Sequence, residues 1–184
     1  MNKQVWIEKA LGLGIQEFEI YQSTTVEKEM TWFQGQMDTL VSSKVTGTSI
    51  RGIVDGKMAN MALEEIDDSM CETVLKSLIE QAHIISNEET DSLRKPEPIE
   101  YVKKDVTWNM ASTEYVKDIL QSLEAKILAY DPRVIQVGYL GYCQGSGSRS
   151  IVNSLGMDVQ DADEMQYIVA SVVVKENEEI KDAS

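Results

Sequence analysis

The segment Ile50-Arg51-Gly52-Ile53-Val54-Asp55-Gly56 closes the first of two similar patterns in this sequence. Each pattern starts with an amphipathic helix, continues through a short apolar strand and a polar return ending in glycine, and finishes in a β-rich run followed by charge. The first pattern starts at Val5, and the second runs from Val116 to Val172-Val173-Val174-Lys175-Glu176-Asn177. Two helix-plus-meander units can each offer one apolar sheet face, so we expect one shared core covered by helices.

The first pattern predicts a helix followed by antiparallel strands. Helical spacing of apolar residues covers Lys3 to Leu13, and the period then changes toward two between Glu17 and Ala62, which is typical of strands with one covered face. Turns are predicted at Gln34-Gly35, Thr46-Gly47 and Asp55-Gly56. The last of these is a strong signal for a two-residue hairpin.

A second helix and a connector follow. The helix is predicted after the capping residues Asp67-Asp68-Ser69, and its apolar stripe ends near Ser86-Asn87. The segment from Glu88 to Met110 contains Pro96 and Pro98 and has no sustained period, so it indicates an irregular connector.

The second pattern predicts another helix, capped by Ser112 and stopped by Asp131-Pro132. Strands are expected after it at Val134 to Cys143, Arg149 to Ser154 and Met165 to Lys175, with a flexible turn at Gly145-Ser146-Gly147-Ser148. The charged residues Glu176, Glu178, Glu179 and Asp182 are interpreted as a solvated tail.

The order of these elements predicts an α+β fold, in which antiparallel or mixed β-sheet meanders carry helices on one face. The chain, residues 1–184, is expected to form a single N-terminal domain built from two similar helix-plus-meander halves. The first half covers residues 1–86, the connector residues 87–111 and the second half residues 112–184. A chain of this length with 42% hydrophobic residues can bury a substantial core.

The charge of the chain argues against nucleic acid as a partner. Thirty-one acidic and seventeen basic residues give a formal charge of −14, which opposes a phosphate backbone. No apolar run approaches the length of a membrane span, and the N-terminus lacks a signal-peptide core. We therefore expect a cytoplasmic protein that contacts neither nucleic acid nor membrane.

The residue types that usually hold metals are scarce. Cys71 and the single histidine, His83, do not project from one helix face at metal-ligand spacing, and Cys143 lies in a strand-like run. A metal site needs three or four convergent ligands. Both cysteines are interpreted as small buried hydrophobes. No catalytic, cofactor-binding or metal-ligating residue is therefore predicted in this chain.

Two other segments resemble sites but have simpler interpretations. A phosphate loop needs a following helix, whereas a strand is predicted after Gly145-Ser146-Gly147-Ser148. The acidic residues Glu64, Glu65, Asp67 and Asp68 lie at a helix start, where they interact favourably with the helix dipole.

Two motifs resemble one known family. Gly47 to Ala59 reads as G-x-x-x-R-x-x-x-D-G-K before an acidic-capped helix, which is similar to the N-terminal part of TldD/PmbA proteins. Asn153-Ser154-Leu155-Gly156-Met157 resembles the N-S-x-G-x turn of that family, and Val172 to Glu179 resembles the charged segment that leads into its C-terminal half. The resemblance extends over nearly the whole chain.

The resemblance implies a bacterial metallopeptidase system that acts on unfolded or modified peptides, including peptide maturation, through a heterodimer of related subunits. The zinc ligands of that family lie in the C-terminal domain of the TldD-type subunit, and that domain is absent from this chain. The shorter first pattern is similar to the PmbA-like subtype, which lacks the metal motif. The older description of the family as modulators of DNA gyrase has no support in the charge of this chain.

The resulting hypothesis is a non-catalytic N-terminal domain of a PmbA/TldD-like peptidase subunit. It would shape a chamber, hold an extended or unfolded peptide against the strand near Met165 to Val174, and form a homo- or hetero-oligomer with a TldD-type subunit. The alternative is a stand-alone protein- or peptide-binding scaffold module without peptidase activity. A third hypothesis, a hydrolase acting by itself, would need metal-dependent cleavage by the chain alone.

Overall fold

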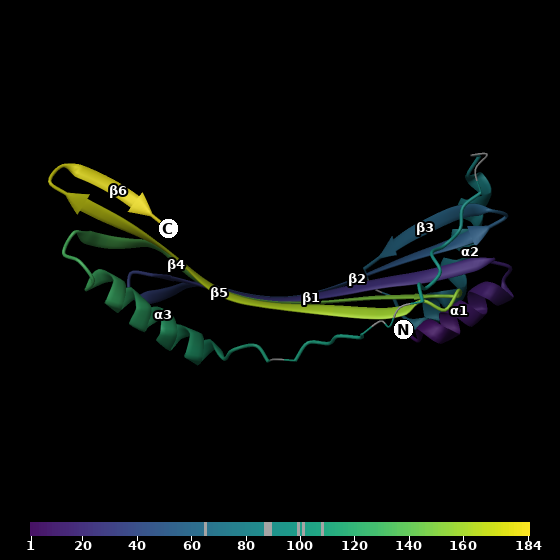
Figure 1. Cartoon of the computed structure of the whole chain (residues 1–184), viewed down its shortest axis with the longest axis horizontal. Coiled ribbons are helices and arrows are strands. Elements are labelled where there is room, and N and C mark those ends of the chain that lie inside the picture. The colour runs from purple at the N-terminus through teal and green to yellow at the C-terminus, as the bar shows by residue number, and fades with distance from the viewer. Residues whose placement is uncertain (65, 87–89, 99, 101, 108) are drawn as a thin grey trace. The chain divides into compact units, whose positions relative to one another are not determined.

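The computed structural model describes residues 1–64, 66–86, 90–98, 100, 102–107 and 109–184. The elements in these residues, in chain order, are α1 (Lys3–Gly12), β1 (Glu17–Phe33), β2 (Gln36–Val54), β3 (Lys57–Leu63), the short 3-10 helix η1 (Asp68–Met70), α2 (Cys71–Ile84), α3 (Thr113–Leu128), β4 (Val134–Asn153), β5 (Asp158–Glu176) and β6 (Glu179–Ala183) (Figure 1).

The strands form one antiparallel sheet in the order β3-β2-β1-β4-β5-β6. At one edge β2 pairs with β3 from Thr48↔Leu63 to Val54↔Lys57, and at the other β5 pairs with β6 from Val172↔Ala183 to Glu176↔Glu179. The α+β class predicted from the sequence is therefore confirmed. The hairpin turns predicted at Gln34-Gly35 and Asp55-Gly56 are also present, and all four residues have positive φ.

Two predicted turns are wrong. Thr46-Gly47 lies inside β2, and Gly145-Ser146-Gly147-Ser148 lies inside β4. Both segments remain extended because neighbouring strands supply hydrogen-bond partners for them. The hydroxyl groups of Thr46 and Thr24 lie 2.9 Å apart across the β1–β2 pair, and β4 has a partner strand on each side. Glycine and serine in these strands therefore do not mark chain reversals.

The C-terminal residues are also more ordered than a solvated tail. A turn at Asn177, which has a φ of 55°, reverses the chain, and Glu179–Ala183 pair with β5 as β6. All five side chains of β6 are exposed, so charge and strand pairing coexist here.

The chain divides into two compact units, which we describe separately. Unit 1 contains residues 1–24, 45–105 and 147–162, and unit 2 contains residues 25–44, 106–146 and 163–184. Each unit therefore draws residues from both halves of the sequence, because β1, β2, β4 and β5 are long enough to contribute to both.

The core of unit 1 lies between the strands and the helices α1 and α2. Its buried residues include Trp6, Phe18, Leu75 and Leu78, each with no exposed surface. Gly52 permits the close approach of a helix, since a Cβ atom at this position would come within 2.9 Å of side-chain atoms of both Ile15 and Leu78.

A buried carboxylate joins the two family-like motifs in unit 1. The side chain of Glu19, which is 2% exposed, accepts hydrogen bonds from Nε and Nη2 of Arg51 at 2.7 and 2.6 Å and from Nδ2 of Asn153 at 3.1 Å. The other side-chain atom of Asn153, Oδ1, accepts from the backbone N–H groups of Leu155 and Met157. Arg51 and Asn153, far apart in sequence, therefore share one acceptor, and sequence reasoning did not identify Glu19.

The core of unit 2 lies between α3 and the strands β1 and β4. Val116 and Leu120 of α3 pack against Met30 of β1 and Leu140 of β4, and all four are fully buried. The buried carboxylate of Glu124 on α3 accepts from Nε1 of Trp32 at 2.7 Å and from the N–H of Gly35 at 3.0 Å. These hydrogen bonds connect the β1–β2 hairpin to α3.

The chain leaves α3 through an exposed ion-pair network. Asp131 accepts hydrogen bonds from Nε and Nη2 of Arg133, both at 2.9 Å, and Nη1 of Arg133 lies 3.4 Å from Glu176 at the end of β5. The hydrogen bonds from the Arg133 side chain, followed by its backbone N–H, lower the pKa of Asp131 to about 2.

We predict that Arg51→Met lowers the free energy of unfolding by about 2 to 4 kcal/mol, because it leaves the buried Glu19 carboxylate without its cation. Adding Glu19→Gln to this variant should recover part of the loss, since a neutral amide needs no counter-charge. Urea unfolding measures both changes. A double variant no more stable than Arg51→Met would contradict the role of Arg51 as the cation that stabilises the buried Glu19 carboxylate. Lys76→Met breaks an exposed ion pair with Glu72 and is the control, with an expected change below about 1 kcal/mol.

We also predict a pH dependence from Asp131. Its pKa is lower in the folded chain, about 2, than the ordinary value of 3.8, so its contribution to stability is present above pH 4 and is lost as the pH falls toward 2. Asp131→Asn should therefore make the stability decrease less steeply between pH 4 and pH 2, as measured by urea unfolding at each pH. Asp182→Asn on β6 is the control. If both variants changed the pH dependence of the stability equally, the prediction would be refuted.

Candidate functional site

The residues considered as metal ligands do not come together. Cys71 is 1% exposed in the core of unit 1, and its burial raises the pKa of its thiol. His83 lies at the exposed end of α2, where its Nε2 is 3.7 Å from the carboxylate of Asp55. Cys143 is half-buried in β4 of unit 2.

Among the described residues, no group of three or more histidine, cysteine, aspartate or glutamate side chains is arranged to hold a metal ion. The donor set of this part of the chain therefore does not fit the zinc site that the family resemblance implies for a partner subunit.

The acidic residues before α2 act within the fold. Asp67 caps η1 by accepting from the N–H of Ser69 at 2.7 Å, and Asp68 accepts from the N–H of Asn2 and from Nε1 of Trp6, both at 2.9 Å. A hydrogen bond from the Ser69 hydroxyl, followed by that from its N–H, lowers the pKa of Asp67. The bonds from the Asn2 N–H and then from the Trp6 indole lower the pKa of Asp68. Glu65, considered with them, lies outside the described residues, and so do residues 87–89, 99, 101 and 108 of the connector region.

The outer edge of β5 is open along part of its length. In unit 1 the connector lies along its first part: the N–H of Lys104 donates to the carbonyl of Gln160, and Lys103 pairs with Asp158. In unit 2 the N–H of Thr107 donates to the carboxylate of Glu164, and β6 covers the edge from Val172 onward. Between these two, no described strand pairs with Met165–Ser171 on this side.

This finding corrects the position of the predicted edge. The edge proposed from the sequence for peptide binding extends to Val174, but Val172 and Val174 are paired with Ala183 and Lys181 of β6. The open part ends at Ser171.

The direction of the backbone groups in this segment follows from strand alternation. The N–H of Lys175 donates to the carbonyl of Arg133, just before β4, so the backbone N–H and C=O groups of odd-numbered residues of β5 point toward β4. The backbone groups of even-numbered residues point outward, as the hydrogen bond from the N–H of Lys104 to the carbonyl of Gln160 also shows. The backbone N–H and C=O groups of Gln166, Ile168 and Ala170 therefore point to the open edge.

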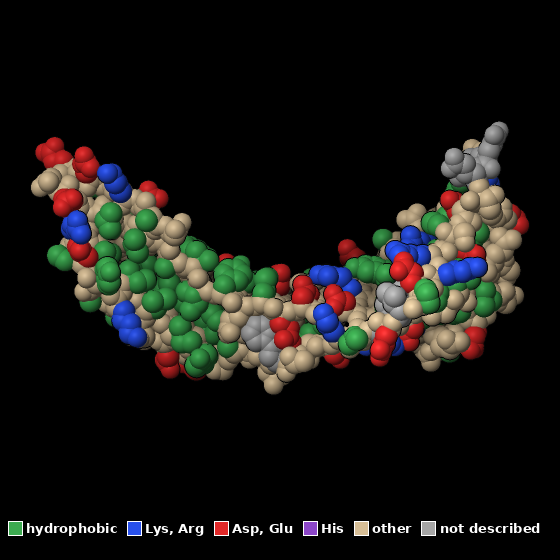
Figure 2. Space-filling view, viewed as in Figure 1, with side chains coloured by type: hydrophobic (Ala, Val, Ile, Leu, Met, Phe, Trp, Pro, Cys, Tyr) green, Lys and Arg blue, Asp and Glu red, His purple; other side chains and the backbone are tan. Residues whose placement is uncertain are grey.

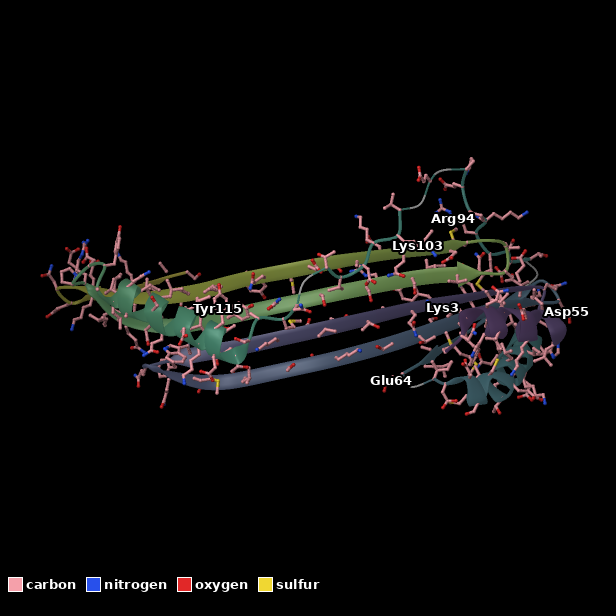
Figure 3. The ribbon with its side chains drawn as sticks, turned by 90° about the horizontal axis from the view of Figure 1, so that it is seen from below. Lys3, Asp55, Glu64, Arg94, Lys103 and Tyr115 are labelled. Atoms are coloured by element: carbon pink, nitrogen blue, oxygen red, sulfur yellow. The ribbon has the colours of Figure 1, made fainter. Side chains whose placement is uncertain are left out.

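A shallow groove lies beside this edge, on the face of unit 2 that carries α3. Its volume is about 580 Å³, and it is lined by Tyr115, Asp118, Ile119, Ser122, Leu123 and Lys126 of α3 and by Ile168 of β5. Figure 2 shows hydrophobic side chains gathered on the side of unit 2 where β5 and α3 lie, and Figure 3 places Tyr115 on α3. Helix α3 packs on β1 and β4 and leaves Ile168 39% exposed.

The opposite face of β5 in unit 2 carries aromatic residues, and no helix of the described residues covers it. Tyr139 of β4 and Tyr167 of β5 are 42% and 48% exposed. Burial, then the nearby charge of Glu29, raises the pKa of the Tyr139 phenol, and a hydrogen bond with Cys143 raises that of Tyr167. The two faces of the edge strand therefore differ: one lies beside a helix, and the other is open.

Sequence reasoning found the strand but not the open segment or the groove. Alternation around Ile168 could indicate a strand, yet nothing in the sequence says where β6 and the connector stop. None of the helices in the described part of the chain is long and apolar enough to cross a membrane.

Comparisons with known proteins identify the family. Residues 18–86 match the family profile described as PmbA/TldA metallopeptidase domain 1, and residues 107–184 match the profile of the PmbA/TldA metallopeptidase central domain. No curated protein sequence matches the chain significantly.

Solved structures share the fold. A proposed modulator of a DNA gyrase from Thermotoga maritima has a TM-score of 0.77 and 17% identity, over 98% of this chain and 40% of that one. TldE from Thermococcus kodakarensis has a TM-score of 0.77 and 18% identity, over 97% and 40%. A proposed modulator of DNA gyrase from Bacteroides thetaiotaomicron has a TM-score of 0.70 and 18% identity, over 98% and 42%.

This chain thus spans about two fifths of the length of these structures. The two family profiles together cover most of its residues, in the order that the sequence motifs predict. The chain belongs to the PmbA/TldD metallopeptidase family, of which it contains the first and central domains.

Proposed function

We propose that this chain is the non-catalytic N-terminal part of a PmbA-like peptidase subunit, and that it holds an extended or unfolded peptide along the open edge of β5. The observation that carries the proposal is the segment Met165–Ser171, which has no strand partner on its outer side among the described residues. Unpaired backbone groups at a sheet edge bind an extended chain of almost any sequence.

The partners in this proposal follow from the family. The fold shared with TldE from Thermococcus kodakarensis supports pairing with a TldD-type subunit. In such an assembly zinc would be held by the C-terminal domain of the TldD-type subunit, and this chain would shape part of the chamber around the peptide. Its role would be to bind and orient the peptide backbone.

A proline at the open edge tests the binding mode. Ala170→Pro removes an outward N–H and leaves the inward hydrogen bonds to β4 in place, so the fold should survive. We predict that it weakens binding of an extended peptide at least about fivefold. Ala170→Ser, which keeps the N–H, should bind like the unchanged chain. Fluorescence anisotropy with a labelled unfolded peptide measures both affinities; unchanged binding by Ala170→Pro would refute the proposal.

The second prediction concerns catalysis. The purified chain should cleave no unfolded peptide, with or without added zinc, because the described residues offer no metal-ligand cluster. Mass spectrometry of the peptide after incubation measures cleavage, and a known zinc peptidase on the same peptide is the positive control. Reproducible zinc-dependent cleavage by the chain alone would instead support an independent hydrolase.

A further inference from the structure

The residues of β5 that offer backbone groups to the open edge are also those whose side chains lie on the face of α3. Nε2 of Gln166 donates to the hydroxyl of Tyr142, which belongs to the core under α3, and Ala170 packs against the same core. Ile168, between them, lines the groove with the α3 residues. The same three alternate residues of β5 therefore offer their backbone groups to the open edge and their side chains to the face that carries α3.

A strand added to this edge would continue the same alternation. A residue paired directly with Ile168 would have its side chain on the same face, with its Cβ about 5 Å from that of Ile168. That side chain would lie over the groove, whose walls include Ile119 and Leu123 of α3. Its neighbours in the added strand would lie on the opposite face, where unit 2 has no helix among the described residues.

The chemistry of the groove favours an apolar side chain. Ile119 and Leu123 are half-buried and Ile168 is 39% exposed, so an apolar group placed between them would remove apolar surface of all three from water. The charged residues Asp118 and Lys126 are exposed. Their opposite signs give the groove no net preference for a charged ligand.

We infer that the groove beside α3 selects extended peptides that carry an apolar side chain at every second residue. This inference rests on the proposed function and adds a substrate class to it: segments with strand-like alternation, which folded proteins keep buried and unfolded chains expose. The unpaired backbone groups of the edge supply affinity for a peptide of any sequence, and the groove supplies the preference for apolar side chains.

Two labelled synthetic peptides test the preference, one of alternating Leu and Thr and one of alternating Ser and Thr, both flanked by Lys for solubility. We expect the Leu/Thr peptide to bind about tenfold more tightly in fluorescence anisotropy. Ile168→Thr should weaken binding of the Leu/Thr peptide about fivefold and change that of the Ser/Thr peptide less than about twofold.

The neighbouring residue provides the matched control. Val169 is 41% exposed, close to the 39% of Ile168, but its side chain lies on the opposite face of the same strand. Val169→Thr should change the affinity for either peptide less than about twofold. Both replacements keep a β-branched side chain on an exposed strand position, so folding should be unaffected.

The outcomes separate the inference from the function on which it rests. If both peptides bind equally, Ala170→Pro weakens both and Ile168→Thr changes neither, the groove inference is wrong and the edge proposal stands. If neither peptide binds, or Ala170→Pro has no effect, both are wrong. If sedimentation shows that two copies of the chain pair through this edge and the peptides do not compete, a second copy is the occupant and the inference is overturned.

Discussion

Each backbone amide and carbonyl of a strand needs a hydrogen-bond partner, and the outer edge of β5 meets this requirement differently along its length. The connector covers its beginning and β6 covers its end, while Met165–Ser171 has no described strand on its outer side. The candidate site is defined by where these two neighbours stop. A longer β6 or a displaced connector would remove it without changing any side chain of β5.

Within each unit, a buried carboxylate organises segments that are distant in sequence. Glu19 of unit 1 binds Arg51 and Asn153, and Glu124 of unit 2 binds Trp32 and the backbone of Gly35. A buried carboxylate is costly unless its oxygen atoms are hydrogen-bonded. These contacts give the family-like motifs a structural role, because Arg51 and Asn153 both bind the buried carboxylate of Glu19.

The proposed binding of a peptide backbone agrees with the charge of this chain and with the open edge of β5. A charge of −14 disfavours nucleic acid, and the described residues lack a cluster of metal ligands. What remains is a sheet with an open edge and, beside it, an apolar groove lined by α3. In the proposed function, this surface would hold an extended chain, and the groove would favour apolar side chains on one face of that chain.

The sequence by itself determined the features that depend on neighbouring residues. Asp55-Gly56 requires positive φ and makes a hairpin, Ser112 caps α3, and apolar spacing gives the three helices and the α+β class. The tertiary structure alone decided that Gly47 and Gly145–Ser148 stay extended, that Glu179–Ala183 form a strand, and that Ile168 lies open beside α3. These outcomes depend on which strand lies beside each residue, and local propensity carries no information about such distant partners.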